Sequence, residues 1–272
     1  MSVKRISALG QINIYFVKCM RLFLYEKQWF NFVSSAIIIF LVCTATSDDM
    51  FDEIVATRQG CFALVCACIW VGLFNSIQSI VRERGIIKRE HRTGLNIGSY
   101  IIAHVIYEAL MCGIETFIII GFTLVHNNSH LPYDGLVFSM EMDMFITLFL
   151  VTFSSDLLAM IISCLVRKET TAMTIMPFVL MVQLIMSGLL FELGTITEKI
   201  SHLTISKWGL DALTSIANTT KSVKQGYRAM ELTGADPTAE NLMHLWMILM
   251  LFAVMYTIIS IAILSQVDRD KR

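Results

Sequence analysis

Long runs of apolar residues divide the chain into six segments. They cover about residues 29–45, 60–81, 98–125, 142–166, 172–191 and 242–264. Each run is close to or above the ~20 residues that an α-helix needs to cross the hydrocarbon of a bilayer. The runs are continuous rather than alternating, which does not fit membrane-spanning strands. The pattern predicts an all-α membrane protein with six transmembrane helices.

Composition supports the same class of protein. Of the 272 residues, 56% are hydrophobic and 16% are charged, whereas a soluble domain has about 45–50% apolar and about 25% charged residues. So little charge cannot cover a water-soluble globule, and the excess apolar residues must face lipid. The net charge of −1 gives no reason to expect nucleic acid as a partner.

The basic residues predict the orientation. With both termini in the cytoplasm, the inner segments hold fifteen of the 21 Lys and Arg residues. Basic residues concentrate in short cytoplasmic loops of membrane proteins, and an even number of spans keeps both termini on one side. We therefore expect a multi-pass protein of the cell membrane with both termini cytoplasmic.

The segment before the first apolar run has a different pattern. From Ile6 to Phe23, apolar residues recur every three or four positions, and basic residues lie beside them. This spacing is typical of an amphipathic helix in the headgroup region, and the alternative is a cytoplasmic helix packed on a partner. We assign residues 1–28 to this interfacial or connecting helix and residues 29–272 to the six-span domain.

The densest charge cluster lies on the inner side, at about residues 82–97. It mixes glutamates with basic residues, which orientation alone does not require, and it suggests a helical surface made for a protein partner. The residues concerned are Arg82, Glu83, Arg84, Lys88, Arg89, Glu90 and Arg92.

Three carboxylates fall inside the predicted spans. Glu108 and Glu115 are seven residues apart and share one helix face, and Asp156 lies in the next span. Ionisable groups in a membrane are costly and often functional. They could form the pathway of an ion- or proton-coupled transporter. We favour the simpler interpretation, in which they form hydrogen bonds inside the helix bundle.

Few motifs point to catalysis. Residues 48–52 read DDMFD, which matches the DDxxD pattern of magnesium-dependent prenyl-transferring enzymes, but no second aspartate-rich motif follows. A polytopic membrane enzyme is therefore only an alternative. His126 and His130 lie four apart in a polar turn, too little for a zinc site, and Asn127 and Asn218 open glycosylation patterns.

The chain contains no phosphate-binding loop. We expect no catalytic residue, no metal and no cofactor in this chain, and ATP, if it is used, to bind another subunit.

Three stretches together resemble the transmembrane domain of ABC exporters of the G subfamily and their bacterial ABC-2-type permease relatives. The first contains Glu83-Arg84, Arg89-Glu90, Gly94, Tyr100 and Glu108. The second runs from RKET at residue 167 to MSGLLFEL at 186–193, and the third contains SKW and DAL between residues 206 and 213. Ala109 stands where the family often has proline, which leaves a kink at that point in doubt.

The resemblance implies the permease subunit of an ABC exporter that works by alternating access. A second permease subunit, identical or different, would pair with it. A separate ATPase subunit, which holds ATP and Mg, would dock on residues 82–92, and residues 192–240 would cap the exit path. A cysteine at position 210 would then be reachable from outside.

The cavity for a hydrophobic or amphipathic cargo would be lined from the second and fifth spans, because those spans face each other in the family. The candidates are Phe74, Asn75, Gln78, Met176, Phe178, Met181, Gln183, Leu184 and Met186.

Overall fold

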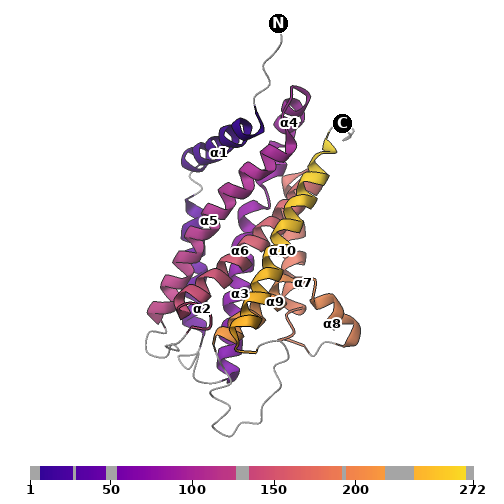
Figure 1. Cartoon of the computed structure of the whole chain (residues 1–272). Helices are drawn as coiled ribbons and strands as arrows, with labels where there is room; N and C mark the ends of the chain where they lie inside the picture. Colours follow the sequence, from indigo (N-terminus) through magenta and orange to yellow (C-terminus); the bar gives the residue numbers. More distant parts are fainter. Residues whose placement is uncertain are drawn as a thin grey trace.

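The computed structural model describes residues 7–26, 29–46, 54–126, 135–191, 194–217 and 236–267. Within these ranges the protein consists of helices and has no strand (Figure 1). The helices are α1 (Ala8–Tyr25), α2 (Phe30–Ala45), α3 (Ile54–Ser76), α4 (Ser79–Arg92), α5 (Ile97–His126), α6 (Met140–Leu165), α7 (Glu169–Ile185), α8 (Thr195–Ser201), α9 (Ile205–Ile216) and α10 (Ala239–Leu264). The predicted all-α class is confirmed.

All six predicted apolar runs contain a helix, but not all are long enough to span. Four helices in the described ranges are long and apolar enough to cross a membrane: α3 continued by α4, α5, α6 and α10. A fifth span results if α1 and α2, which meet at 71°, are taken together. The protein is thus a multi-pass membrane protein, but the count of six spans is not confirmed.

The fifth predicted span ends early. Helix α7 has 17 residues and stops at Ile185, although the apolar run continues to residue 191. Gly188 has a φ of +79°, a left-handed conformation that glycine adopts without strain. The chain turns here, and the apolar side chains that follow leave the helix.

Helix α6 forms the centre of the bundle and contacts α3, α5, α9 and α10. Small residues let the neighbouring helices approach closely, as is usual in membrane bundles. Gly72 of α3 lies directly against the backbone carbonyl of Thr152 and the backbone nitrogen of Asp156, where a Cβ has no room. Ser154 donates a hydrogen bond of 3.1 Å to the carbonyl of Leu249 on α10.

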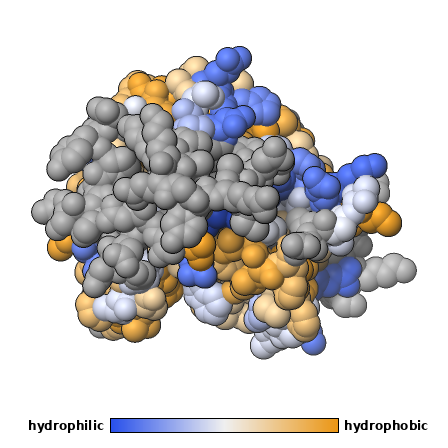
Figure 2. Space-filling view, turned by 90° about the horizontal axis from the view of Figure 1, so that it is seen from below, coloured by the Kyte–Doolittle hydropathy of each residue, from blue (hydrophilic) through white to orange (hydrophobic). Residues whose placement is uncertain are grey.

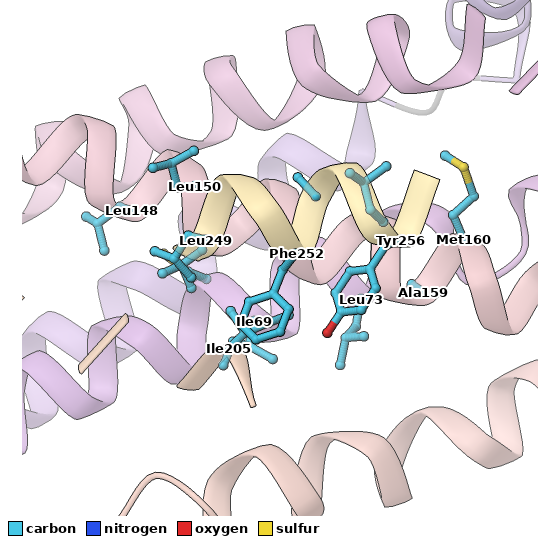
Figure 3. Packing of buried hydrophobic residues seen from close by; sticks show 14 of the residues in the cluster. Ile69, Leu73, Leu148, Leu150, Ala159, Met160, Ile205, Leu249, Phe252 and Tyr256 are labelled. Carbon is cyan, nitrogen blue, oxygen red and sulfur yellow. The ribbon is translucent and has the colours of Figure 1, made fainter. Parts of the chain in front are cut away.

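Among the described residues, the apolar core is one cluster to which eight helices contribute, namely α2 to α7, α9 and α10, and Figure 3 shows part of it. Ile69 and Leu73 of α3 and Ile205 of α9 are fully or almost fully buried, next to Leu249 and Phe252 of α10. Burying each such side chain stabilises the fold by about 1.5–3 kcal/mol in water, and in lipid the gain comes from close packing. The helix α9 therefore belongs to the core rather than to a surface loop.

Large apolar side chains also cover the outside of the bundle. Phe117 of α5, Met247 and Ile258 of α10 and Leu41 of α2 are all more than half exposed. Seen from the end that carries α8, orange apolar side chains reach the rim on several sides (Figure 2). A soluble monomer rarely exposes apolar patches of this extent, so this surface fits contact with lipid.

The charged helices gather at the opposite end. Helix α1 lies across this end, α4 projects from it, and the C-terminal end of α10 reaches it (Figure 1). The expected amphipathic N-terminal helix is present, and its buried Cys19 packs with Tyr107 and Met111 of α5. Ser7 caps it by accepting a hydrogen bond from the Gly10 amide.

Candidate functional site

Helix α4 carries the charge cluster that the sequence singled out. Its first amides, those of Ile80 and Val81, donate to the hydroxyl of Ser163 on α6 at 3.1 and 3.0 Å, so a neighbouring helix satisfies its N-terminus. At the other end, Gly94 has a φ of +113°, and the amide of Leu95 donates to the carbonyl of Glu90. These contacts mark the two ends of α4, which runs from Ser79 to Arg92.

The two glutamates of α4 are used inside the chain. Glu83 accepts hydrogen bonds of 2.8 Å from Lys18 on α1 and from Tyr100 on α5. Glu90 accepts a hydrogen bond of 2.9 Å from Tyr15, whose pKa is raised by burial and by this carboxylate. The rings of Tyr15 and Tyr100 meet edge to face at 5.3 Å. Helices α1, α4 and α5 thus form one hydrogen-bonded unit.

The arginines of α4 fall into two groups. Arg84 donates to the carbonyls of Cys164 and Val166 at 2.5 and 3.1 Å. These bonds give carbonyl groups at the C-terminal end of α6 a hydrogen-bond partner. Arg82, Arg89 and Arg92 are exposed. Among these three, Arg82 lies 3.4 Å from Glu169 at the start of α7 and also contacts Gln78.

The remaining basic residue, Lys88, is half-buried. Part of the predicted cluster therefore bonds to other helices of the chain, and part of it forms an exposed basic surface.

A cavity of about 290 Å³ lies beneath α4. Helices α1, α2, α3, α4 and α5 line it, together with Met173 of α7. The structure brings together here residues that the sequence suggested for three different roles, namely Phe74, Asn75, Gln78, Arg82, Glu83, Glu108 and Glu115. The cavity lies within one chain, so its walls do not require a second copy.

The three intramembrane carboxylates differ in their partners. Glu115 accepts hydrogen bonds from Asn75 at 2.6 Å and from Ser35 at 3.3 Å. Glu108 also faces the cavity, is 4% exposed, and lies near Ser76. Asp156 is fully buried, and neither of its oxygens has a hydrogen-bond partner in the described part of the chain. The hydrogen bonding that we expected inside the bundle is therefore present for Glu115 and lacking for Asp156.

The candidates on α7 do not share one surface. Met176 is buried, whereas Phe178 and Met181 are more than half exposed. Leu184 and Met186 are half-buried. None of these five residues lines the cavity beneath α4.

Gln183 connects α7 to α9. It is buried and accepts from the Ser206 amide through its side chain at 3.1 Å, while its backbone carbonyl accepts from the Ser206 hydroxyl at 2.5 Å. These bonds tie α7 to the start of α9.

Sequence reasoning missed a buried helix within residues 192–240, the segment predicted to cap the exit path. In α9, Ile205, Leu210 and Leu213 are buried, so the expectation that position 210 is accessible was wrong. Lys207 and Asp211, 3.5 Å apart, stand on the same helix, and burial raises the pKa of Asp211 against the effect of Lys207. Positions 205, 209, 210, 213 and 216 are buried and recur at the spacing of one helix face. This spacing could have predicted the helix, but the low mean hydropathy of the surrounding segment obscured it.

Several sequence motifs fall outside the described residues. These are the DDMFD stretch, His130, Asn127 and Asn218. His126 is the last residue of α5. In the ranges that the structure describes, no three His, Cys, Asp or Glu side chains are grouped to hold a metal ion.

Comparison with known proteins agrees with this architecture. The family model of the ABC-2 type transporter matches residues 10–217, from α1 to the end of α9. The chain is 23% identical over 159 residues to an ABC transporter ATP-binding/permease protein of Mycobacterium tuberculosis. The match covers 57% of this chain and 18% of that protein. The cluster on α4, the helices α2 to α7 and the buried α9 lie within the family match, whereas α10 follows it, and the chain belongs to the ABC-2 type transporter family.

Proposed function

We propose that this protein is the permease subunit of an ATP-driven exporter of the cell membrane, with both termini in the cytoplasm. The observation that carries the proposal is the family match from α1 to α9, which includes the helix α4 and every helix that braces it. The mycobacterial relative is named for both ATP binding and permease function. Here we assign the hydrolysis of ATP, with its Mg, to a separate ATPase subunit.

Helix α4 would receive the motion of the ATPase. The exposed arginines Arg82, Arg89 and Arg92 offer a basic surface, which suits an acidic groove on the partner. Bonds from Glu83, Glu90 and Arg84 connect α4 to α1, α5 and α6. A displacement of α4 is therefore passed to most of the bundle, as alternating access requires.

A second permease subunit would cover the exposed aromatic side chains of α3 and α7. Phe74 is 42% exposed and stacks on Trp70 at 5.3 Å, and Phe178 and Met181 are exposed on α7. Thioethers and aromatic rings adapt to irregular apolar shapes. We assign a hydrophobic or amphipathic cargo to the path between the two copies.

The test is purification of the tagged full-length chain from its native membrane, followed by reconstitution into vesicles. We expect an ATPase to copurify and to drive uptake of a fluorescent amphipathic dye into inside-out vesicles. Uptake should stop without ATP and continue when an ionophore collapses the proton gradient. Uptake that needs the gradient and not ATP would instead support the ion-coupled alternative, and an absent ATPase would contradict the proposal.

A further inference from the structure

The cavity beneath α4 has an unusual lining. Aromatic side chains form one part of its wall, namely Phe23, Phe32, Phe74 and Tyr107. Carboxylates form another part, namely Glu26, Glu83, Glu108 and Glu115. Arg82 is the one Lys or Arg in the described lining. A cavity that combines aromatic rings with several acidic groups needs a chemical explanation.

The basic groups near the cavity pair with carboxylates other than Glu108 and Glu115. Lys18 pairs with Glu83, and Arg82 pairs with Glu169 on α7. Among the described residues, no such ion pair compensates Glu108 or Glu115. The partners of Glu115 are the neutral side chains of Asn75 and Ser35. In the part of the chain that the structure describes, no Lys or Arg forms an ion pair with either glutamate.

The depth of these glutamates makes their presence costly. Glu108 is 4% exposed and Glu115 1% exposed, and both lie within the apolar helix α5, which is long enough to span. Within the described ranges, the carboxylate of Asp156 and the hydroxyl of Ser76 are also buried without hydrogen-bond partners. An unpaired carboxylate in such surroundings is strongly destabilised unless a cation or a proton compensates its charge.

We propose that this cavity binds an organic cation. An ammonium group would lie against Glu108 and Glu115, where the low dielectric strengthens the attraction. Its apolar substituents would contact the rings of Phe23, Phe32 and Phe74, which also attract a cation over their faces. A volume of about 290 Å³ is at the small end of ligand pockets, so the ligand is a small aryl- or alkylammonium.

Two features favour this ligand over a metal ion. Hard cations such as Ca²⁺ take about six to eight oxygen ligands, and no three His, Cys, Asp or Glu side chains among the described residues are grouped to hold such an ion. The amide nitrogen of Asn75 also points at Glu115 as a donor, which orients it for a carboxylate rather than for a metal. The site lies inside one chain and does not depend on the proposed transport function.

The test is equilibrium binding of radiolabelled benzyltrimethylammonium to the full-length chain in nanodiscs of zwitterionic lipid, from pH 6 to pH 9. The neutral competitor is neopentylbenzene, which has the same shape without the charge. We expect saturable binding that the neutral compound does not displace. Glu108→Gln and Glu115→Gln should each weaken binding at least tenfold. Glu240→Gln, in the exposed first turn of α10, is the matched control and should leave binding unchanged.

A second variant guards against loss of folding. Met111→Trp fills the cavity, which Met111 lines, and keeps both glutamates. It should abolish binding while the thermal unfolding transition is retained. Several results would overturn the proposal: no saturable binding at any pH, equal displacement by neopentylbenzene, displacement by millimolar Na⁺ or Ca²⁺, or undiminished binding by a folded Met111→Trp variant. Because no ATP or partner enters the experiment, its outcome is separate from that of the transport test.

Discussion

Lys18 on α1 and Glu83 on α4 form an ion pair with 2.8 Å between Nζ and Oε2. Tyr100 of α5 donates to the same carboxylate oxygen at 2.8 Å. One glutamate thus connects α4 both to the next helix, α5, and to α1, whose Lys18 lies 65 residues earlier in the sequence. The N-terminal helix is therefore fixed to the bundle as a structural part of it, and its position depends on that of α4.

The two glutamates of α4 should differ in their contribution to stability. Glu83→Gln removes an ionic bond and weakens a second hydrogen bond, and hydrogen bonds to charged groups contribute about 1.5–3 kcal/mol. Glu90→Gln weakens one bond to the neutral Tyr15 and should cost about 1 kcal/mol. Unfolding of both variants in detergent, followed by circular dichroism, measures the difference. Equal losses would show that the Lys18 pair contributes little.

Charge reversal on the exposed side of α4 should release the ATPase. Arg89→Glu together with Arg92→Glu changes two exposed side chains near the end of α4 and replaces favourable charge with repulsion. We expect the partner to be lost from pull-downs at physiological salt. Lys199→Glu, on the exposed α8 at the opposite end, is the control. Retention of the ATPase by the α4 variant would refute the docking surface.

The packing of α9 on α6 gives a steric prediction. A Cβ at Gly209 would lie 2.7 Å from Cγ2 of Val151, so Gly209→Ala should destabilise the protein by about 1–3 kcal/mol through overpacking. Gly121→Ala in α5 meets nothing within 4 Å and should be neutral or stabilising by up to about 1 kcal/mol. Thermal unfolding of the two alanine variants provides the comparison. A stable Gly209→Ala protein would mean that α9 is not packed in this way.

Residues 192–240, which we predict to lie outside the cell, should react unevenly with thiol reagents. Leu203 is 70% exposed, whereas Leu210 is 3% exposed. Leu203→Cys should therefore react with an impermeant maleimide added to whole cells, and Leu210→Cys should react at least tenfold more slowly. The native cysteines are buried or half-buried and give a low background. Labelling of Leu203→Cys only from the cytoplasmic side would overturn the orientation.

Much of the membrane part could be predicted because apolar runs and helices share the same residues. The expected spans at 98–125, 142–166 and 242–264 correspond closely to α5, α6 and α10. The span lengths were less predictable. Hydropathy does not register the turn at Gly188, which ends α7 early, or the continuation of α3 into α4, since both depend on local backbone geometry.

The roles of the charged residues could be predicted only in part. The sequence located the cluster on α4, but it could not tell that Glu83 and Glu90 face inward while Arg89 faces outward. That division depends on Tyr15, Lys18 and Tyr100, which reach α4 only through the fold. The same holds for Glu108 and Glu115, whose shared cavity is formed by helices from separate parts of the chain.

The span from Val55 to Arg92, in which α4 follows α3 after a turn at residues 77–78, has a mechanical consequence. When the two helices move together, its 38 residues act as a rod of about 57 Å at ~1.5 Å per residue. Gly72, where the rod lies directly against the backbone of α6, is near its middle and can act as a fulcrum. A tilt of about 10° about this point moves each tip by about 5 Å. The two tips move in opposite directions, so a push on Arg89 at one face of the membrane becomes a swing of Thr57 at the other.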